Sequence, residues 1–503
     1  MDTSGTPLQR PDPAYLRRAV ILRVALLLVG ALLLPGRTLA APFAVRGPGV
    51  RPADFRVTVF ATNLSFPVGM VQLPDHSLLV AVTEGTSFWN GNGKLIRLVD
   101  ADGDGVADSA GKVLYSGLAG GLTSLRRHGS LFFTLGQGSG RPIAVLRAGA
   151  TPDASLIMVG KINFTYPGGG WLHPHSALNV RTTPGDPASC DLFFQVGSDQ
   201  NFAKTTRTVT LGSTQIAGAT GTLEGESIYR LTLTDRGTNV VASNLTRIAK
   251  GLRNPAGFDF HPVTGDLYFE DNGIDGLSDP NNAFSADELN VIPAAALGNG
   301  TVHDFGYPAN YTAFDTGIVV GGGGIQPLVA FQPVIEDGLE SEAEGPNDIA
   351  FAPPGFPPGL DNGIFVGFHG KWALAGIAND ENPLAFVDLR TTNYFHFISN
   401  REPHIGHLDG LLSTADSLFA SDITSTGATE NSTQAGVIYQ IKSQVGRLSL
   451  RTRAGMPELT WPAGMLQQAP EVAGPWTDLP TASSPHPMDR DPGSSTLYFR
   501  VKN

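Results

Sequence analysis

One short pattern recurs along this chain of 503 residues: an apolar strand, a tight turn and a second apolar strand. A Pro or Gly opens each unit, and the turn is built on Asp, Gly or Pro. By our count the pattern occurs about six times. The paired strands are expected at 67–75 and 78–82, 121–125 and 131–135, 173–180 and 192–196, 254–260 and 266–269, 347–351 and 363–366, and 408–412 and 417–420.

Short strands that repeat between Gly and Pro turns, without a strong helical period, indicate radial repeats of antiparallel sheet. The 61 glycines and 37 prolines fit a fold with many tight turns. One unit alone cannot bury both of its faces, so the units must stack and the ring must close. A β-sandwich needs fewer residues and would not repeat the pattern so often. The sequence therefore predicts an all-β fold, with a six-bladed β-propeller over residues 54–442.

The composition changes after Lys442. Residues 446–503 contain short apolar runs at 448–450, 459–461 and 497–501, separated by many prolines. This pattern predicts a small C-terminal β module, similar to a β-sandwich. Nothing in it suggests chemistry, and attachment, spacing and sorting all remain open as its role.

The N-terminus has the features of an export signal over residues 1–40. Four arginines precede the apolar run 25–36, and small residues follow at 38–41, where a signal peptidase would cut. The alternative is a retained membrane anchor, but the run is shorter than the roughly 20 residues that a spanning helix needs. We expect a secreted or periplasmic protein without stable membrane insertion. Its single cysteine, Cys190, cannot form an intrachain disulfide.

The formal net charge of −12 argues against a nucleic-acid partner, which requires clustered Lys and Arg. Chemistry in a propeller is expected on loops at the mouth of the central channel. One candidate there is His173, which follows the glycine run 168–170. A neutral imidazole can act as a general base, and Asp199 could orient it. Two alternatives remain open: a histidine that only bonds backbone, and a metal pair of His173 with His175.

A second candidate is a cation site in the segment 100–108, where Asp alternates with Gly. Oxygen ligands at every second residue are typical of a calcium loop. Gly111 stands where an EF-hand has its bidentate Glu, so this is not an EF-hand. A structural calcium and an empty polar turn both remain open. The predicted ligands are Asp100, Asp102, Asp104 and Asp108.

The order GLRNPAG, FHPVTGDLYFEDNG, DELNVI and DFGYP between Lys250 and Pro308 resembles the soluble glucose/sorbosone dehydrogenases that depend on pyrroloquinoline quinone (PQQ). The resemblance extends over most of the segment 55–442. It implies a PQQ- and calcium-dependent enzyme that oxidises an aldose or related sugar at the anomeric carbon. The small-molecule partner would be a sugar, and the sequence does not indicate the electron acceptor.

The resemblance also implies roles for single residues. His173 would be the catalytic base and Asp199 the residue that orients it. Gly273 would help hold a catalytic calcium, and Glu288 would bind a second, structural calcium. The residues implied at the cofactor are Arg253, Asn254, Asn272, Gly273, Lys371 and His407.

Some residues differ from the family pattern. Leu172 replaces an acidic residue before the base, and the glutamine expected at 117–122 is absent. His407 stands close to where the family has one of a pair of arginines near 402–409. These arginines neutralise cofactor carboxylates, and His is a weaker, pH-dependent substitute. The alternatives are therefore a redox-inactive propeller that binds carbohydrate or protein, and a calcium-dependent lactone or ester hydrolase.

Overall fold

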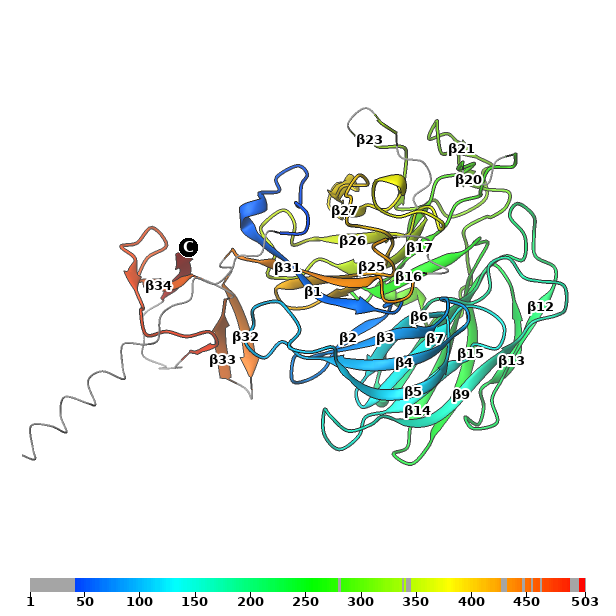
Figure 1. Cartoon of the computed structure of the whole chain (residues 1–503), viewed down its shortest axis with the longest axis horizontal. Helices are drawn as coiled ribbons and strands as arrows, with labels where there is room; N and C mark the ends of the chain where they lie inside the picture. Colours follow the sequence, from blue (N-terminus) through cyan, green and yellow to red (C-terminus); the bar gives the residue numbers. More distant parts are fainter. Residues whose placement is uncertain are drawn as a thin grey trace, which may run out of the picture. The chain divides into compact units, whose positions relative to one another are not determined.

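The computed structural model describes residues 41–278, 282–336, 339–340, 345–426, 432–445, 448–453, 456–461, 464–488 and 497–502 (Figure 1). The predicted signal peptide, residues 1–40, lies outside this range. The described residues contain many strands, three 3-10 turns and no α-helix. Within this range no helix is long and apolar enough to cross a membrane. The 3-10 turns are η2 (Pro52–Asp54), η3 (Ala294–Ala296) and η4 (Gly376–Ala378).

Most of the described strands belong to sheets of four to six strands. The first consists of β2 (Met70–Gln72), β3 (Leu78–Gly85), β4 (Gly91–Leu98) and β5 (Lys112–Ala119). The second consists of β6 (Leu122–His128), β7 (Leu131–Gly136), β8 (Ile143–Arg147), β9 (Ile157–Thr165), β12 (Thr208–Gly212) and β13 (Thr220–Glu224). The third consists of β10 (Leu178–Thr183), β11 (Asp186–Val196), β14 (Ser227–Asp235), β15 (Val240–Lys250) and β19 (His303–Asp304).

Three further sheets complete this set. The fourth consists of β16 (Pro255–Phe260), β17 (Leu267–Asp271), β18 (Glu288–Ile292) and β22 (Val329–Ala330). The fifth consists of β25 (Pro346–Phe351), β26 (Gly363–Phe368), β27 (Leu384–Asp388) and β28 (Tyr394–Ile398). The sixth consists of β29 (Leu408–Ser413), β30 (Ser417–Asp422), β31 (Gly436–Ser443) and β1 (Phe55–Leu64).

The first strands of these sheets form a ring. β2 contacts β6, and the contacts continue through β10, β16, β25 and β29 back to β2. A pair of antiparallel strands begins each sheet: β2 with β3, β6 with β7, β10 with β11, β16 with β17, β25 with β26, and β29 with β30. The strand pairs expected from the repeated pattern coincide with these pairs, and the fold is of the β-propeller type.

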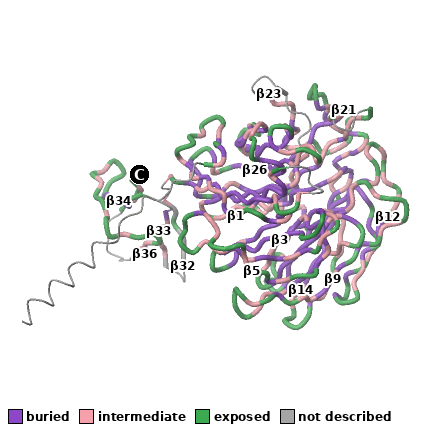
Figure 2. The backbone as a smooth tube through the Cα atoms, viewed as in Figure 1, coloured by how far each residue is buried: buried purple, intermediate pink, exposed green. Residues whose placement is uncertain are grey.

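Apolar clusters lie between neighbouring sheets, which explains why the sheets stack. β3 is an example, because its side chains alternate between two faces. Leu79 and Ala81 pack toward Phe132 of the second sheet. Leu78 and Val80 pack on the other face, toward Phe419 of the sixth sheet. Figure 2 shows the resulting pattern: buried backbone along the strands and exposed backbone at the loops.

The sixth sheet joins the two ends of the ring. Its outer strand β1 precedes all the other sheets in sequence, yet it pairs with β31, with Val57 opposite Ile441. A non-covalent seam of main-chain hydrogen bonds therefore closes the ring.

The remaining described strands are short. β20 (Tyr311–Thr312) pairs with β21 (Val319–Val320), and β23 (Ile335–Glu336) pairs with β24 (Leu339–Glu340). The C-terminal segment has two three-stranded sheets: β32 (Ser449–Arg453), β33 (Met456–Thr460) and β36 (His486–Pro487), and β34 (Met465–Ala469), β35 (Thr477–Asp478) and β37 (Tyr498–Lys502). Leu459, Trp461 and Leu466 are the buried centre of this segment.

Candidate functional site

A cavity of about 190 Å³ lies at the amino ends of the ring strands, and we call it the N-end cavity. Residues at or just before the starts of β2, β6, β10, β16, β25 and β29 contribute to its wall. Phe88 and Trp372 supply aromatic surface. The polar side chains in the wall are Thr123, Gln137, Ser176, Asn254, Asn272, Asn347, His369 and Asp409.

A histidine and an aspartate form the most reactive pair in this wall. The His369 Nδ1–H donates to Asp409 Oδ1 at 2.7 Å, and Asn347 Nδ2 donates to the same oxygen. The neutral ring then carries its lone pair on Nε2, which is buried and has no hydrogen-bond partner among the described residues. His369 stacks on Trp372, with ring centroids 4.8 Å apart. This is the arrangement of a general base whose tautomer is set by a carboxylate.

The predicted His407 lies directly behind this pair rather than in the wall. Its ring stacks on His369 at 4.5 Å, and its Nδ1–H donates to the His369 carbonyl at 2.7 Å. Burial, followed by the neighbouring His369, lowers the pKa of His407 to about 3. A neutral His407 cannot replace an arginine opposite a carboxylate group.

Asn254 and Asn272, both predicted from the sequence, meet in the cavity wall. Asn254 Nδ2 donates to Asn272 Oδ1 at 2.6 Å, and Asn272 Nδ2 donates to the Pro346 carbonyl at 2.7 Å. Both amide NH₂ groups therefore donate a hydrogen bond, whereas Asn254 Oδ1 is buried and has no partner among the described residues. Asp409 Oδ2 is likewise buried and has no partner in the described part of the chain, so the wall offers two hydrogen-bond acceptors here.

Arg253, Gly273 and Glu288 line a small neighbouring pocket that shares Asn272 with the N-end cavity. The Arg253 guanidinium points away from that cavity: it donates to Asp275 at 2.5 Å and to Asn201 Oδ1 at 2.8 Å. A Cβ at Gly273 would lie 2.2 Å from the Ser285 carbonyl oxygen, so this loop needs a glycine.

Negative charge is in excess at this neighbouring pocket. Burial, followed by the Asp271 and Asp287 carboxylates, raises the pKa of Glu288 to about 8. Burial is also the main reason why the pKa of Asp271 rises to about 7. Oxygen-rich sites with uncompensated carboxylates suit a hard cation such as calcium. The chemistry of this pocket, which both Gly273 and Glu288 line, therefore suits a cation.

His173 and Asp199 lie close in the fold but have different partners. The His173 amide donates to the Ser198 carbonyl at 2.9 Å, and its Nε2 is buried without a partner in the described chain. Burial, followed by the charge of Arg253, holds the pKa of His173 well below its usual value. Asp199 accepts from Arg207 Nε at 2.6 Å, and no hydrogen bond between His173 and Asp199 is present among the described residues.

The structure also bears on the roles expected for His175 and Lys371. Both ring nitrogens of His175 form hydrogen bonds, one with the Tyr166 hydroxyl and one with the Arg141 carbonyl, each at 2.7 Å. The metal pair of His173 with His175 is therefore wrong. Lys371 Nζ pairs with Asp380 at 2.7 Å and is not part of the cavity wall.

The loop between β4 and β5 gathers three of its four predicted ligands. Carboxylate oxygens of Asp100, Asp102 and Asp104 all lie within 4.8 Å of one another. Asp108 is not in this group, and its Oδ2 instead accepts the Ala101 amide at 2.8 Å. Three clustered carboxylates are suitable calcium ligands.

PQQ fits the N-end cavity less well than calcium fits the neighbouring pocket. PQQ has three carboxylates, and anions of this kind are normally bound by Arg or Lys. Among the described residues no Arg or Lys lines the N-end cavity, and Asp409 adds a negative charge. The wall offers acceptors where the cofactor needs donors, so its charge does not complement PQQ.

The sequence pointed to the cavity's location but missed its reactive pair. His369 stands in the stretch 368–372, which drew attention for Lys371, and Asp409 follows His407 by two residues. The pair joins the end of β26 to the start of β29. The two residues are 40 positions apart in sequence, so no local motif predicts their contact.

Comparisons with known proteins place the fold. No protein-family model matches this chain. A curated uncharacterized protein of Borreliella burgdorferi is 53% identical over 45 residues, which are 9% of this chain and only 11% of that protein.

Solved structures match over a much longer range. The holo PQQ domain of pyranose dehydrogenase from Coprinopsis cinerea covers 80% of this chain and 97% of its own, at 15% identity and a TM-score of 0.50. The PQQ-bound aldose sugar dehydrogenase of Streptomyces coelicolor covers 78% of this chain and 99% of its own, at 16% identity and a TM-score of 0.45. The apo soluble aldose sugar dehydrogenase of Escherichia coli covers 77% of this chain and 99% of its own, at 13% identity and a TM-score of 0.47. The likeness to the first of these structures establishes a fold and no activity, and the fold is the one that the resemblance in sequence predicted: that of the PQQ-dependent sugar dehydrogenases.

Proposed function

We propose that this chain binds a sugar in the N-end cavity and oxidises it at the anomeric carbon. The observation that supports this best is the His369–Asp409 pair, a carboxylate-held imidazole in the wall of a cavity rich in acceptors. Sugar hydroxyls donate hydrogen bonds, and so they complement the unpartnered Asn254 Oδ1, His369 Nε2 and Asp409 Oδ2. The likeness in fold to sugar dehydrogenases supports oxidation rather than hydrolysis.

Oxidation of a hydroxyl-bearing carbon removes a proton from oxygen and a hydride from carbon. In our proposal the proton passes to His369 Nε2, and Asp409 stabilises the imidazolium that forms. Trp372, stacked on the imidazole, keeps the ring in place and excludes water from one of its faces. His173, the base predicted from the sequence with Asp199 as its neighbour, is the rival for this role.

PQQ and calcium are the cofactor and metal that the resemblance implies. If bound, the quinone would supply a two-electron acceptor and calcium a Lewis acid. Gly273 would help hold the catalytic calcium, and Glu288 would bind a second, structural one. Asp100, Asp102 and Asp104 are the proposed ligands of a further cation. Because the cavity's charge does not complement the quinone carboxylates, we derive no step through the cofactor.

The proposal includes the organisation of the chain. We take the six ring-forming sheets as six propeller blades over residues 54–442, and residues 446–503 as a separate module. Export with cleavage after residue 40 would place the protein outside the cytoplasm. These assignments are supported by the contacts of the ring strands and by the sequence of the N-terminus.

The test is reconstitution of the purified protein with PQQ and excess calcium. Binding of PQQ is monitored through the change in its absorbance. A panel of aldoses with a dye as final electron acceptor then measures turnover, and titration calorimetry measures sugar binding without cofactor. We expect His369→Ala to lower turnover by about 100-fold or more, the range of a lost general base. Exposed His404 provides the matched control variant, His404→Ala.

The outcomes separate the candidates. If His173→Ala abolishes turnover while His369→Ala does not, the sequence-based assignment of the base replaces ours. If PQQ does not bind at high micromolar concentration and no dye is reduced, oxidation by this cofactor is excluded.

A carbohydrate-binding protein without redox activity is the second candidate. The absence of Arg and Lys from the described cavity wall favours it. It predicts that a sugar binds without PQQ, that His369→Ala weakens this binding, and that no dye is reduced under any condition.

A further inference from the structure

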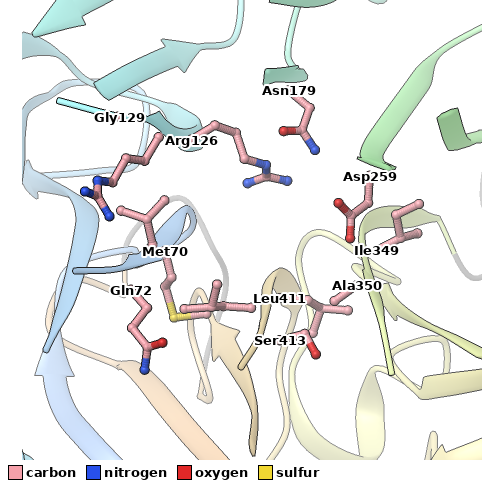
Figure 3. Close-up of a pocket in the computed structure, with 13 residues that line it drawn as sticks. Met70, Gln72, Arg126, Gly129, Asn179, Asp259, Ile349, Ala350, Leu411 and Ser413 are labelled. Carbon is pink, nitrogen blue, oxygen red and sulfur yellow. The ribbon is translucent and has the colours of Figure 1, made fainter. Parts of the chain in front are cut away.

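A second, larger cavity of about 440 Å³ lies on the ring strands, away from the N-end cavity. All six ring strands contribute to it, and we call it the C-end cavity. Figure 3 shows Arg126 and Asp259 pointing into it from different strands. Its volume is in the range of small-molecule sites. Its polar residues are Gln72, Arg126, Arg127, Asn179, Asp259 and Ser413.

One of the two arginines in this cavity wall has no ion-pair partner in the described part of the chain. Arg127 has no ion pair among the described residues, and its buried Nε has no hydrogen-bond partner. Its guanidinium lies 5.9 Å from the centre of the Phe132 ring, which fixes its position without neutralising its charge. The buried Ser413 hydroxyl is also without a partner in the described chain.

The carboxylates of the cavity are already engaged. Asp259 accepts the backbone amides of Phe260 at 2.8 Å and Phe351 at 3.3 Å. Asp348, just beyond the wall, accepts Arg126 Nη2 at 2.9 Å and the Leu411 amide at 3.0 Å. Arg126 is thus paired with Asp348, whereas Arg127 has no counter-charge among the described residues.

The Asn179 side chain offers a ligand no free hydrogen-bond acceptor, because its oxygen is already bonded. Its Nδ2 donates to the Phe258 carbonyl at 2.6 Å, and its Oδ1 accepts the Val180 amide at 2.7 Å. What the wall lacks is therefore an oxyanion next to Arg127. The N-end cavity has the opposite character, because its unpartnered atoms are acceptors.

We propose that the C-end cavity is a second binding site, specific for a small organic anion of up to monosaccharide size, whose carboxylate pairs with Arg127. Ser413 and the Gln72 amide would donate to its remaining oxygens. Met70, Ile349 and Leu411 would contact its carbon atoms. This site does not depend on the activity proposed for the N-end cavity.

Titration calorimetry of the full chain tests the site, with D-gluconate as the anionic probe and D-glucose as the neutral probe of similar size. We expect Arg127→Gln to weaken gluconate binding by at least about tenfold, because a charge-assisted pair is lost. Glucose binding should not change. Arg390→Gln is the matched control, since Arg390 is exposed and already paired with Asp388 at 3.1 Å.

Ser413→Ala gives a milder test that leaves the charge in place, and we expect it to weaken gluconate binding by about threefold to tenfold. Melting temperatures of all variants verify the fold. Gluconate binding that survives in Arg127→Gln overturns the proposal. So does glucose binding that weakens in Arg127→Gln as much as gluconate binding does. Gluconate binding that is lost in His369→Ala also overturns it, because that result would locate the anion in the N-end cavity.

Discussion

Asp422, at the end of β30, shows how one buried carboxylate links the stability of the protein to pH. The side chain is fully buried, and its oxygens accept the backbone amides of Gly406 at 2.7 Å and His407 at 2.9 Å. Burial outweighs these hydrogen bonds and raises the pKa of Asp422 from 3.8 to about 7. Its carboxylate holds the backbone just before β29, next to the N-end cavity.

The raised pKa predicts a direction for stability. The folded state binds the Asp422 proton more tightly than the unfolded state, so its contribution is fully present below pH 3.8 and is lost as the pH rises to about 7. A shift of this size corresponds to roughly 4 kcal/mol as an upper bound. Asn does not titrate, so Asp422→Asn should lack this pH dependence of stability. The changed hydrogen bonds alter its stability by an amount that does not depend on pH.

Chemical denaturation at several pH values between 4 and 8 measures how the free energy of unfolding depends on pH. The free energy of unfolding of the wild type should fall relative to Asp422→Asn across this range. Asp416→Asn serves as the control, because Asp416 is partly exposed and pairs with Lys442. Its free energy of unfolding should change with pH as that of the wild type does. Parallel curves for the wild type and Asp422→Asn would contradict the prediction.

At the scale of elements, the loop between β17 and β18 depends on one glycine. A Cβ at Gly273 would meet the backbone carbonyl oxygens of Ser285 at 2.2 Å and Ala286 at 2.8 Å. Backbone atoms cannot move aside cheaply, so Gly273→Ala should shift the loop and cost about 1–3 kcal/mol of stability. The calcium proposed at Gly273 should bind at least about tenfold more weakly, because its ligands move with the loop.

Calcium titration calorimetry of the metal-free protein checks this expectation. Gly322→Ala is the matched control, because a Cβ there would meet no atom within 4 Å. Asp102→Asn identifies any calcium that binds at the exposed loop of the first sheet instead. Unchanged calcium affinity in Gly273→Ala would exclude Gly273 from the proposed calcium site.

The elements were far more predictable than the site. Each ring strand carries buried apolar residues and has a Pro or Gly at its first position or within four residues before it, so the strand pairs could be predicted from local sequence. Asn254 and Asn272 could also be found, since they belong to ordered motifs. The pair His369–Asp409 could not be predicted, because it depends on a contact between segments 40 residues apart that only the folded ring brings together. Asp199 was predicted to orient His173, but in the fold it pairs with Arg207 of the same loop.

For the whole molecule, the seam between β1 and β31 decides whether the ring stays closed. Arg56 lies directly opposite Lys442 in this pairing, and both are half-buried. Directly paired antiparallel residues have Cα atoms about 4.5–5.5 Å apart, within the range that a disulfide spans. The only native thiol, that of Cys190, is buried in the core and does not compete.

The double variant Arg56→Cys/Lys442→Cys should therefore form a disulfide that locks the ring. A loop covering almost the whole ring is closed covalently, which restricts the unfolded chain and stabilises the fold by up to about 5 kcal/mol. The measurement is the melting temperature with and without reductant, and only the oxidised double variant should melt higher than the two single-cysteine variants. An oxidised form that melts at the same temperature as the reduced form would contradict the prediction.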